Sequence, residues 1–216
     1  MTLPAIYPIL DTITLAHRGL TVLPVAEAWL GGGAGILQFR HKGSWSRDVF
    51  QQAEQVAALC RAHKALFLVN DRADMAALLG AGLHVGQDDL APADARRIIG
   101  AYALLGFSTH NARQLAAAAA EPVDYLAFGP IFPTASKDNP DPVTGLDELR
   151  QCRAMTRKPL VAIGGITCEN APAVFEAGAD AVAVIGGMLP EPCTAQSLRK
   201  RMEQWQQQIK TQAQAW

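Results

Sequence analysis

Eight short apolar runs recur along the chain, and the stretches between them have helical spacing. The runs lie at residues 5–10, 35–39, 66–69, 83–85, 104–107, 125–128, 160–163 and 181–185. Because they are rich in Leu, Ile, Val and Phe, with little polar alternation, they favour parallel strands buried on both faces. The helical stretches include residues 45–63, 71–79, 92–99, 111–119, 146–155, 168–177 and 194–209. This order of strand and helix predicts an α/β fold, a single closed (β/α)8 TIM barrel.

The length of the chain fits one domain. A chain of 216 residues, half of them apolar, can bury the core that such a barrel needs. We predict that residues 1–202 form the barrel domain. Residues 203–216, which are rich in Gln, are expected to end the last helix and to fray as a C-terminal tail.

Charge and composition exclude several classes of function. The net charge of −1 argues against nucleic-acid or membrane-surface binding through bulk charge, and the apolar runs are too short to span a membrane. The first dozen residues lack a basic segment and include Asp11, so no secretory signal is expected. The cysteines (Cys60, Cys152, Cys168 and Cys193) are scattered, which indicates reduced thiols in a cytoplasmic protein and no metal site built on them.

Polar residues follow most of the predicted strands. Barrel enzymes build their sites from the loops at the carboxyl ends of the strands, so these residues are the candidates for a site. Period-two spacing places three of the candidates after the second strand on one side of the chain. With two glycines of the last two strand ends and Ile185 beside them, the candidates in chain order are Gln38, Arg40, Lys42, Asn70, Asp71, Asp89, Ser108, Thr134, Ser136, Lys137, Gly165, Ile185 and Gly186.

Each group of candidates also has an ordinary structural interpretation. Asn70 and Asp71 could cap the following helix, since Asx residues favour that position. Residues 87–89 could form a plain turn, and the glycine pairs after the last two strands could do the same. His84 lies within a strand, where a histidine is usually a core residue with its hydrogen bonds satisfied. The histidines show no triad order with a Cys or Ser, so nucleophilic catalysis has no support.

The combination of candidates indicates a chemistry. Cations, acids and hydroxyls around one mouth suggest a diphosphate held together with Mg²⁺, because this hard ion prefers carboxylate and phosphate oxygens. The glycine pairs offer a separate pocket for a monophosphate. Two phosphorylated substrates, a diphosphate leaving group and no protein nucleophile indicate an alkyl transfer. The protein would then position the reactants and neutralise the departing charge.

Six sequence blocks in this order resemble the thiamine-phosphate synthase family over nearly the whole chain. The blocks are Gln-x-Arg-x-Lys at 38–42, Val-Asn-Asp at 69–71, His-Val-Gly-Gln-Asp-Asp at 84–89, Gly-x-Ser-x-His at 106–110, Gly-Pro-Ile-Phe-Pro-Thr-x-Ser-Lys at 129–137 and Gly-Gly-Ile-Thr at 164–167. The resemblance implies a TIM barrel that joins hydroxymethylpyrimidine diphosphate to a thiazole phosphate and releases diphosphate with the help of Mg²⁺. It implies phosphorylated small molecules as partners, with neither nucleic acid nor membrane, and leaves homo-oligomer formation open.

The resemblance also implies a role for each matching residue. Metal ligands would be Asp71 and Asp89. Diphosphate ligands would be Arg40, Lys42, Asn70 and Lys137, whereas Gln38 and Ser108 would contact the pyrimidine diphosphate substrate. Of these, Lys137, Arg40 and Ser108 would carry the catalytic roles. Ligands of the thiazole phosphate would be Thr134, Ser136, Gly165 and Gly186, and Ile185 would be a further substrate-binding residue.

Three positions depart from the family pattern. His41 stands where an acid is common, Gly186 replaces a common Ser, and the step at residues 80–82 is one residue short. The short step puts the position of Asp89 in question. The alternatives are a thiazole tautomerase, which lacks the diphosphate-binding residues and can carry a His where this chain has Pro130, and a non-catalytic barrel that binds thiazole phosphate. A phosphate-sugar isomerase fits less well, because no catalytic Lys or Glu stands on a central strand.

Overall fold

A computed structural model describes residues 2–134 and 142–213 of the chain. Its strands are β1 (Ile6–Asp11), β2 (Ile36–Arg40), β3 (Leu66–Asn70), β4 (Gly82–Val85), β5 (Leu105–Thr109), β6 (Tyr125–Phe128), β7 (Leu160–Ile163) and β8 (Ala181–Val184). Its helices are α1 (Thr12–His17), α2 (Val22–Gly31), α3 (Arg47–Ala62), α4 (Ala73–Leu79), α5 (Pro92–Ile99), α6 (Ala112–Ala118), α7 (Gly145–Met155), α8 (Ala171–Glu176), the 3₁₀ turn η1 (Gly186–Met188) and α9 (Ala195–Ala213).

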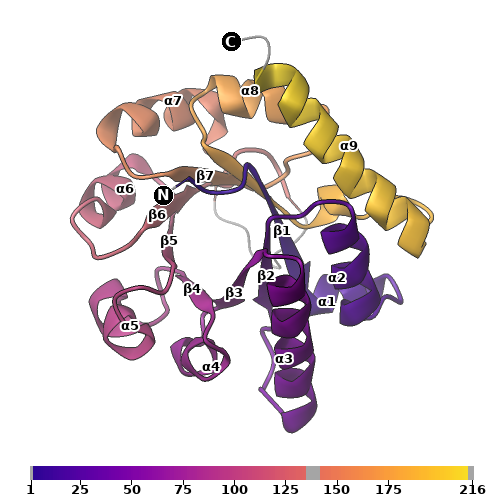
Figure 1. The fold of residues 1–216 in the computed structure, drawn as a ribbon. Helices are drawn as coiled ribbons and strands as arrows, with labels where there is room; N and C mark the ends of the chain where they lie inside the picture. Colours follow the sequence, from indigo (N-terminus) through magenta and orange to yellow (C-terminus); the bar gives the residue numbers. More distant parts are fainter. Residues whose placement is uncertain (1, 135–141, 214–216) are drawn as a thin grey trace.

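The strands form a closed parallel barrel in sequence order, and the helices surround it (Figure 1). Strand β1 closes the ring by pairing with both β2 and β8, with Ile9 opposite Gln38 and Ile6 opposite Val182. The predicted (β/α)8 barrel is therefore confirmed. All eight apolar runs are strands; β6 and β7 have the predicted bounds, and the other six differ by one or two residues at an end.

The core has two layers, because successive strand residues point to opposite faces. Inside the barrel, large side chains such as Tyr7 and Tyr125 pack in one cluster with small ones such as Ala181 and Ala183. The outer layer lies between the barrel and the helices and contains most of the buried Leu, Val and Ile residues. The small residues on β8 leave room inside the barrel for the two tyrosine rings.

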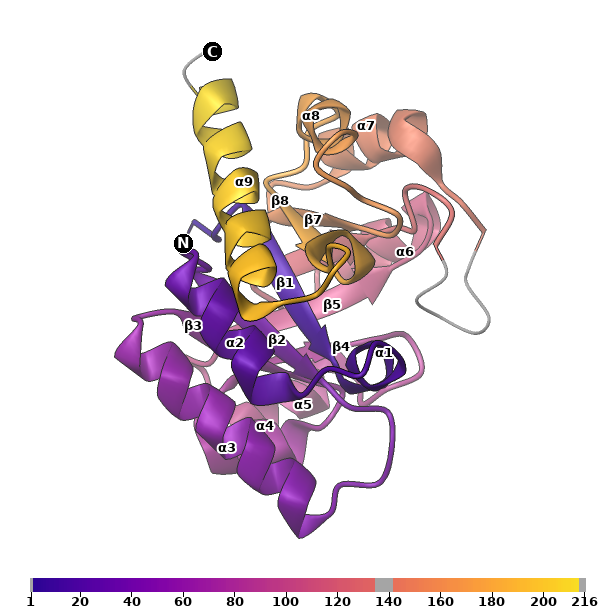
Figure 2. The same cartoon turned by 90° about the vertical axis from the view of Figure 1, so that its right-hand side faces the viewer.

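The segment after β1 contains two helices that are absent from the predicted set, α1 and α2. At the other end of the chain, α9 packs along α2, as the side view shows (Figure 2). Gly32 permits this contact, because a Cβ there would lie 2.8 Å from the Arg199 carbonyl oxygen and from Met202 Cβ. Trp205 of α9 is fully buried, and the predicted division at residue 202 stays a prediction. Among the described residues, no helix has the length and apolar character needed to cross a bilayer.

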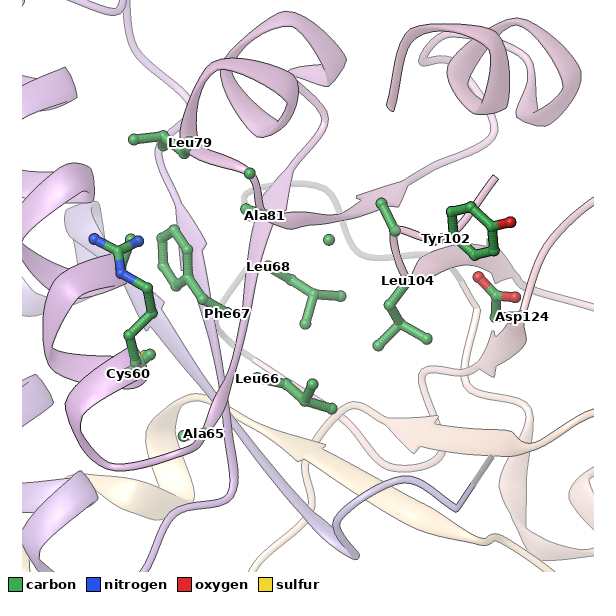
Figure 3. A pocket seen from close by; sticks show the side chains of 15 residues that line it. Cys60, Ala65, Leu66, Phe67, Leu68, Leu79, Ala81, Tyr102, Leu104 and Asp124 are labelled. Carbon is green, nitrogen blue, oxygen red and sulfur yellow. The ribbon is translucent and has the colours of Figure 1, made fainter. Parts of the chain in front are cut away.

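A cavity of about 340 Å³ lies at the amino ends of β3 and β4, away from the candidate site residues (Figure 3). Leu66, Leu68 and Leu104 form part of its wall. The short step at residues 80–82 borders the same cavity. The short step therefore lies at the amino end of β4, whereas Asp89 follows the carboxyl end of that strand.

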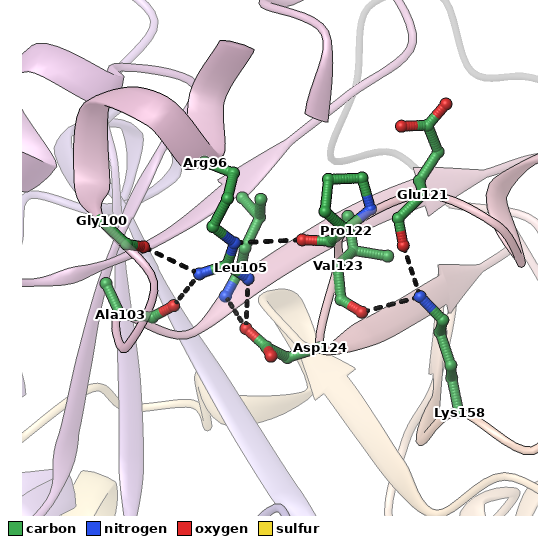
Figure 4. Close-up of polar contacts among 9 residues, drawn as sticks. All are labelled: Arg96, Gly100, Ala103, Leu105, Glu121, Pro122, Val123, Asp124 and Lys158. Atoms are coloured by element: carbon green, nitrogen blue, oxygen red, sulfur yellow. Dashed lines mark hydrogen bonds and ion pairs between the residues drawn. The ribbon is translucent and has the colours of Figure 1, made fainter. Parts of the chain in front are cut away.

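Aspartates tie neighbouring strands together at the same amino-terminal face. The Asp124 carboxylate, just before β6, accepts hydrogen bonds from the Leu105 N–H and from Arg96, each at 2.7 Å (Figure 4). Asp180, just before β8, accepts from the Leu160 N–H at 2.7 Å in the same way. Each carboxylate satisfies the first N–H of the preceding strand, which would otherwise be a buried donor without a partner.

Candidate active site

Strands β1 and β2 deliver a buried ion pair to the carboxyl end of the barrel. The Arg40 guanidinium contacts the Asp11 carboxylate, and the two residues are opposite each other in the strand register. Asp11 also accepts a hydrogen bond from the Thr14 N–H at 2.8 Å and so caps α1. The candidate Arg40 is therefore held by a carboxylate that the sequence analysis did not select, although Asp11 directly follows the first apolar run.

Lys42, Asp71 and Asp89 meet at the ends of β2, β3 and β4. The Lys42 ammonium forms an ion pair with the Asp71 carboxylate, and the Asp89 carboxylate lies near enough to raise the pKa of Asp71. Burial, followed by the proximity of Asp89, raises the pKa of Asp71 to about 6, although Lys42 acts in the opposite direction. Two carboxyl groups this close repel each other when both are ionised, and a cation between them would remove that repulsion.

Asp71 has a backbone conformation that is uncommon for a residue other than glycine. Its φ is +64°, and its N–H donates to the His84 carbonyl of β4 at 2.8 Å. The interpretation that Asn70 and Asp71 cap the following helix is wrong. Helix α4 begins at Ala73 with Arg72 at its N-cap, and no side chain caps it. The left-handed backbone aims the Asp71 carboxylate at Lys42 and Asp89 instead, a strained arrangement of the kind found at functional sites.

The turn after β4 places Asp89. Its Oδ2 accepts a hydrogen bond from the Gly86 N–H at 2.7 Å, so residues 86–89 form a turn as the ordinary interpretation expected. The same turn brings Asp89 to Asp71, and the two interpretations are compatible. Asn70 of β3 lies opposite His84 of β4 in the register. The short step before β4 therefore does not displace the carboxyl end of β4.

Asn70 contributes an unsatisfied donor beside these charges. Asn70 is buried, with 6% exposed, and its Nδ2 has no hydrogen-bond partner among the described residues. A buried amide N–H without a partner is costly, so its presence favours a ligand acceptor at this place. Among the described residues, no group of three or more His, Cys, Asp and Glu side chains could hold a metal ion. A cation here would have two carboxylate ligands, which suits Mg²⁺ because it keeps waters and takes substrate oxygens.

Ser108 and Gln38 lie at opposite ends of a buried polar cluster. The Ser108 hydroxyl is 2.8 Å from Nε2 of His84, and Nδ1 of His84 is 2.8 Å from the Tyr125 hydroxyl. Nε2 of Gln38 donates to the Tyr7 hydroxyl at 2.8 Å. His84 is thus a core histidine with both ring nitrogens engaged, as its position in a strand predicted. Neither tyrosine was predicted to belong to the site, because a tyrosine within an apolar run looks like an ordinary strand residue.

The loops after β6, β7 and β8 pack tightly on one another. The Phe132 N–H donates to the Gly164 carbonyl at 3.1 Å, which joins the first two loops. Gly165 has φ of +63°, and a Cβ there would lie 2.5 Å from the Pro133 carbonyl oxygen, so only glycine fits. These contacts bring half-buried Thr134 to the β7 turn.

The turn after β8 adds the last of the described candidates. Ile185 precedes η1, whose first residue is Gly186, and a Cβ on the adjacent Gly187 would lie 2.6 Å from the Ile166 carbonyl oxygen. The candidates Ser136 and Lys137 lie outside the described residues. Their roles therefore stay predictions.

The closed barrel, with its charged residues gathered at the carboxyl ends of β1 to β4, defines the class of (β/α)8-barrel enzymes. Comparison with known proteins refines that class. The family model described as thiamine monophosphate synthase matches residues 6–188. A thiamine-phosphate synthase from Koribacter versatilis (strain Ellin345) is 47% identical over 195 residues, which cover 89% of this chain and 92% of that protein.

Two further relatives agree. A thiamine-phosphate synthase from Chlorobium phaeovibrioides (strain DSM 265 / 1930) is 42% identical over 201 residues, covering 91% of this chain and 95% of the relative. A solved structure of thiamine phosphate pyrophosphorylase from Pyrococcus furiosus superposes with a TM-score of 0.80 at 31% identity, with 95% of each chain covered. The chain belongs to the thiamine monophosphate synthase family.

Proposed function

We propose that the protein is a transferase that joins hydroxymethylpyrimidine diphosphate to thiazole phosphate and yields thiamine phosphate and diphosphate. Relatives that bear the name thiamine-phosphate synthase cover most of the chain and support this activity. Both substrates are small phosphorylated molecules. The carbon–oxygen bond to the diphosphate breaks, the thiazole nitrogen supplies the electron pair of the new carbon–nitrogen bond, and the diphosphate leaves with the electrons of the broken bond.

The single observation that carries the proposal is the approach of Asp71 to Asp89 beside Lys42. Two acids and a cation with a buried, unpartnered Asn70 amide fit a diphosphate bound together with a divalent cation. Asp71 and Asp89 would hold Mg²⁺, which when bound supplies neutralisation of the charge that develops on the leaving diphosphate.

The other candidates have binding and positioning roles in this proposal. Arg40, Lys42 and Asn70 bind the diphosphate through charge-assisted hydrogen bonds. The positively charged Lys137 is expected to join them from the loop after β6. Gln38 and Ser108 contact the pyrimidine substrate. Thr134, Ser136, Gly165, Ile185 and Gly186 surround the thiazole phosphate, where glycine lets the backbone N–H groups approach an anion.

The test is turnover with both phosphorylated substrates, with and without Mg²⁺. We expect thiamine phosphate and diphosphate to form in equal amounts only when Mg²⁺ is present. Asp89→Asn should lower kcat at least a hundredfold, whereas the matched Asp88→Asn variant, which removes an exposed carboxylate one residue away, should stay within twofold. Isomerisation of the thiazole without diphosphate release would support a tautomerase instead.

The cellular setting is part of the proposal. The cysteines of the chain are free thiols, with Cys60, Cys152 and Cys168 buried, and this suits the reducing cytoplasm. Association into homo-oligomers stays a prediction, which sedimentation of the purified protein would decide.

A further inference from the structure

A chain of hydrogen bonds crosses the interior of the barrel from β2 to β5. Nε2 of Gln38 is 2.8 Å from the Tyr7 hydroxyl, which lies 2.9 Å from the Tyr125 hydroxyl. The Tyr125 hydroxyl is 2.8 Å from Nδ1 of His84, and Nε2 of His84 is 2.8 Å from Oγ of Ser108. The five residues come from five different strands, and the two ends are the residues assigned to the pyrimidine substrate.

The middle of this chain is shielded from solvent. Tyr7 and Tyr125 are at most 1% exposed, Gln38 is 3% exposed and His84 is 9% exposed. Burial raises the pKa of both tyrosines well above the ordinary value, so both keep their protons. A buried O–H or N–H must find an acceptor inside the protein, and so each proton of the chain has to point to a neighbouring member.

This requirement fixes the donor-to-acceptor direction of the hydrogen-bond chain. Because the Gln38 amide donates to Tyr7, the proton of Tyr7 points to Tyr125, and that of Tyr125 points to Nδ1 of His84. Nδ1 is then an acceptor, so the proton of a neutral imidazole is on Nε2 and is donated to Ser108. The reverse order would leave the Tyr7 proton without an acceptor. Ser108, having accepted from His84, has its own proton to donate elsewhere.

Packing holds the central members in place. The Tyr125 ring stacks on the His84 imidazole with 5.5 Å between centroids and 25° between planes, and it meets the Tyr7 ring edge-on at 6.1 Å. A Cβ on Gly106 would lie 2.0 Å from Cζ of Tyr125. Gly106, the glycine of the Gly-x-Ser-x-His block, therefore leaves the space that the Tyr125 ring occupies. The same β5 segment carries both Gly106 and Ser108, so the block links the ring to the hydroxyl.

We propose that Tyr7, Tyr125 and His84 are positioning residues that hold the Ser108 hydroxyl as a hydrogen-bond donor. Its target is an acceptor atom of the pyrimidine diphosphate, a ring nitrogen or a phosphate oxygen. This inference rests on the proposed function for the identity of the ligand. The direction of the chain within the free protein does not depend on that function.

The first test uses the free protein. In a sample with ¹⁵N-labelled histidine at pH 7, we expect His84 to be neutral with its proton on Nε2, and its signals are identified by their loss in His84→Gln. Tyr125→Phe removes the donor to Nδ1 and should shift the Nδ1 resonance. An imidazole with its proton on Nδ1, or an imidazolium, would overturn the proposed direction whether or not the protein is a synthase.

The second test is binding of hydroxymethylpyrimidine diphosphate with Mg²⁺, followed by calorimetry. Tyr125→Phe keeps the ring but removes the hydroxyl, and we expect the Kd to rise about tenfold. Tyr7→Phe leaves the link from Tyr125 to His84 intact and should raise it only two- to threefold. Tyr102→Phe removes a fully exposed hydroxyl and is the matched control without effect. The Kd for thiazole phosphate should not change in any of them.

A double-mutant cycle separates positioning from packing. In a Ser108→Ala background, Tyr125→Phe should change the Kd for the pyrimidine diphosphate less than twofold, because the hydroxyl it orients is gone. An equally large effect in that background, or a lowered melting temperature with an unchanged Kd, would show that the tyrosines only fill the barrel. Absence of thiamine phosphate in the turnover assay would refute the proposed function and leave this cycle to be judged on binding.

Discussion

The Arg40 guanidinium forms an ion pair with the Asp11 carboxylate, and the two residues lie side by side in the register of β2 and β1. The Asp11 side chain is 3% exposed and that of Arg40 is 14% exposed. The ion pair holds the Arg40 guanidinium at the mouth of the barrel in a defined orientation. Because Asp11 also caps α1, one carboxylate connects the start of α1 to Arg40 at the end of β2.

Replacement of Asp11 by Asn should destabilise the protein. Asn retains an oxygen for the α1 cap but leaves Arg40 without a counter-charge. Removing one partner of a fully buried pair costs about 3–5 kcal/mol, and the partial exposure of Arg40 reduces our expectation to about 2 kcal/mol. Urea unfolding measures the change. Asp48→Asn, an exposed carboxylate in the first turn of α3, should cost less than about 0.5 kcal/mol. Equal losses in the two variants would contradict a role for the ion pair.

The raised pKa of Asp71 predicts a pH dependence of stability in buffer without Mg²⁺. Folding raises this pKa from its ordinary value near 4 to about 6, so the folded protein binds more protons than the unfolded chain in that window. The contribution of Asp71 to the free energy of unfolding therefore falls as the pH rises from about 4 to about 6. Asp71→Asn should remove this contribution. Urea unfolding of both proteins at several pH values between about 4 and about 6 measures it, as the pH-dependent part of the difference between their free energies of unfolding.

Above about pH 6, where Asp71 is ionised, added Mg²⁺ should raise the stability that this ionisation lowers. A cation bound to the ionised carboxylates stabilises the folded state by mass action. We expect the melting temperature of the wild type, but not of Asp71→Asn, to rise with Mg²⁺ concentration at pH 7.5. An identical rise in both proteins would place the ion elsewhere.

Gly106→Ala should be strongly destabilising. The new Cβ would overlap the Tyr125 ring, and neither β5 nor the buried ring can move away freely. Overpacking of a core costs about 1–3 kcal/mol, and an overlap with a centrally placed ring should approach the upper value. Gly106→Ala combined with Tyr125→Leu should recover part of the loss in urea unfolding. A double variant that is less stable than Gly106→Ala would show that the ring is not the obstacle.

Asp124→Ala should lower stability without a change in substrate affinity. The substitution removes the acceptor of the Leu105 N–H and of Arg96, and a buried donor without a partner costs about 1–3 kcal/mol. The residue lies at the amino-terminal face, so the KM values for both substrates should match those of the wild type. A tenfold rise in either KM would indicate that the two faces are coupled.

The sequence predicted the barrel because its signal is repeated. Each strand buries both faces and so reads as an uninterrupted apolar run, and helix α5 was predicted with its observed bounds because Pro92 begins it and Gly100 follows it. Helix α1 has only six residues and a single buried side chain, so it carries no apolar periodicity. Pattern reasoning could not detect it.

The candidate site was predicted in part for a related reason. Position at a strand end identified Arg40, Lys42, Asp71 and Asp89, because parallel strands bring their carboxyl ends together. The tyrosine and histidine chain was not predicted, since a tyrosine in a strand looks apolar until its hydroxyl is placed. The capping interpretation of Asp71 was wrong, because the left-handed backbone that redirects the carboxylate has no signal in residue type.

The aspartates before β6 and β8 bear on how such a barrel can be cut and rejoined. Asp124 serves the first N–H of β5 and Asp180 that of β7, so in this half of the molecule an odd strand depends on the even strand that follows it. Duplicating or removing a pair of strands keeps each donor with its acceptor. Duplicating or removing a single strand separates them. In this half of the ring, two strands with their helices are therefore the natural module for grafting or circular permutation.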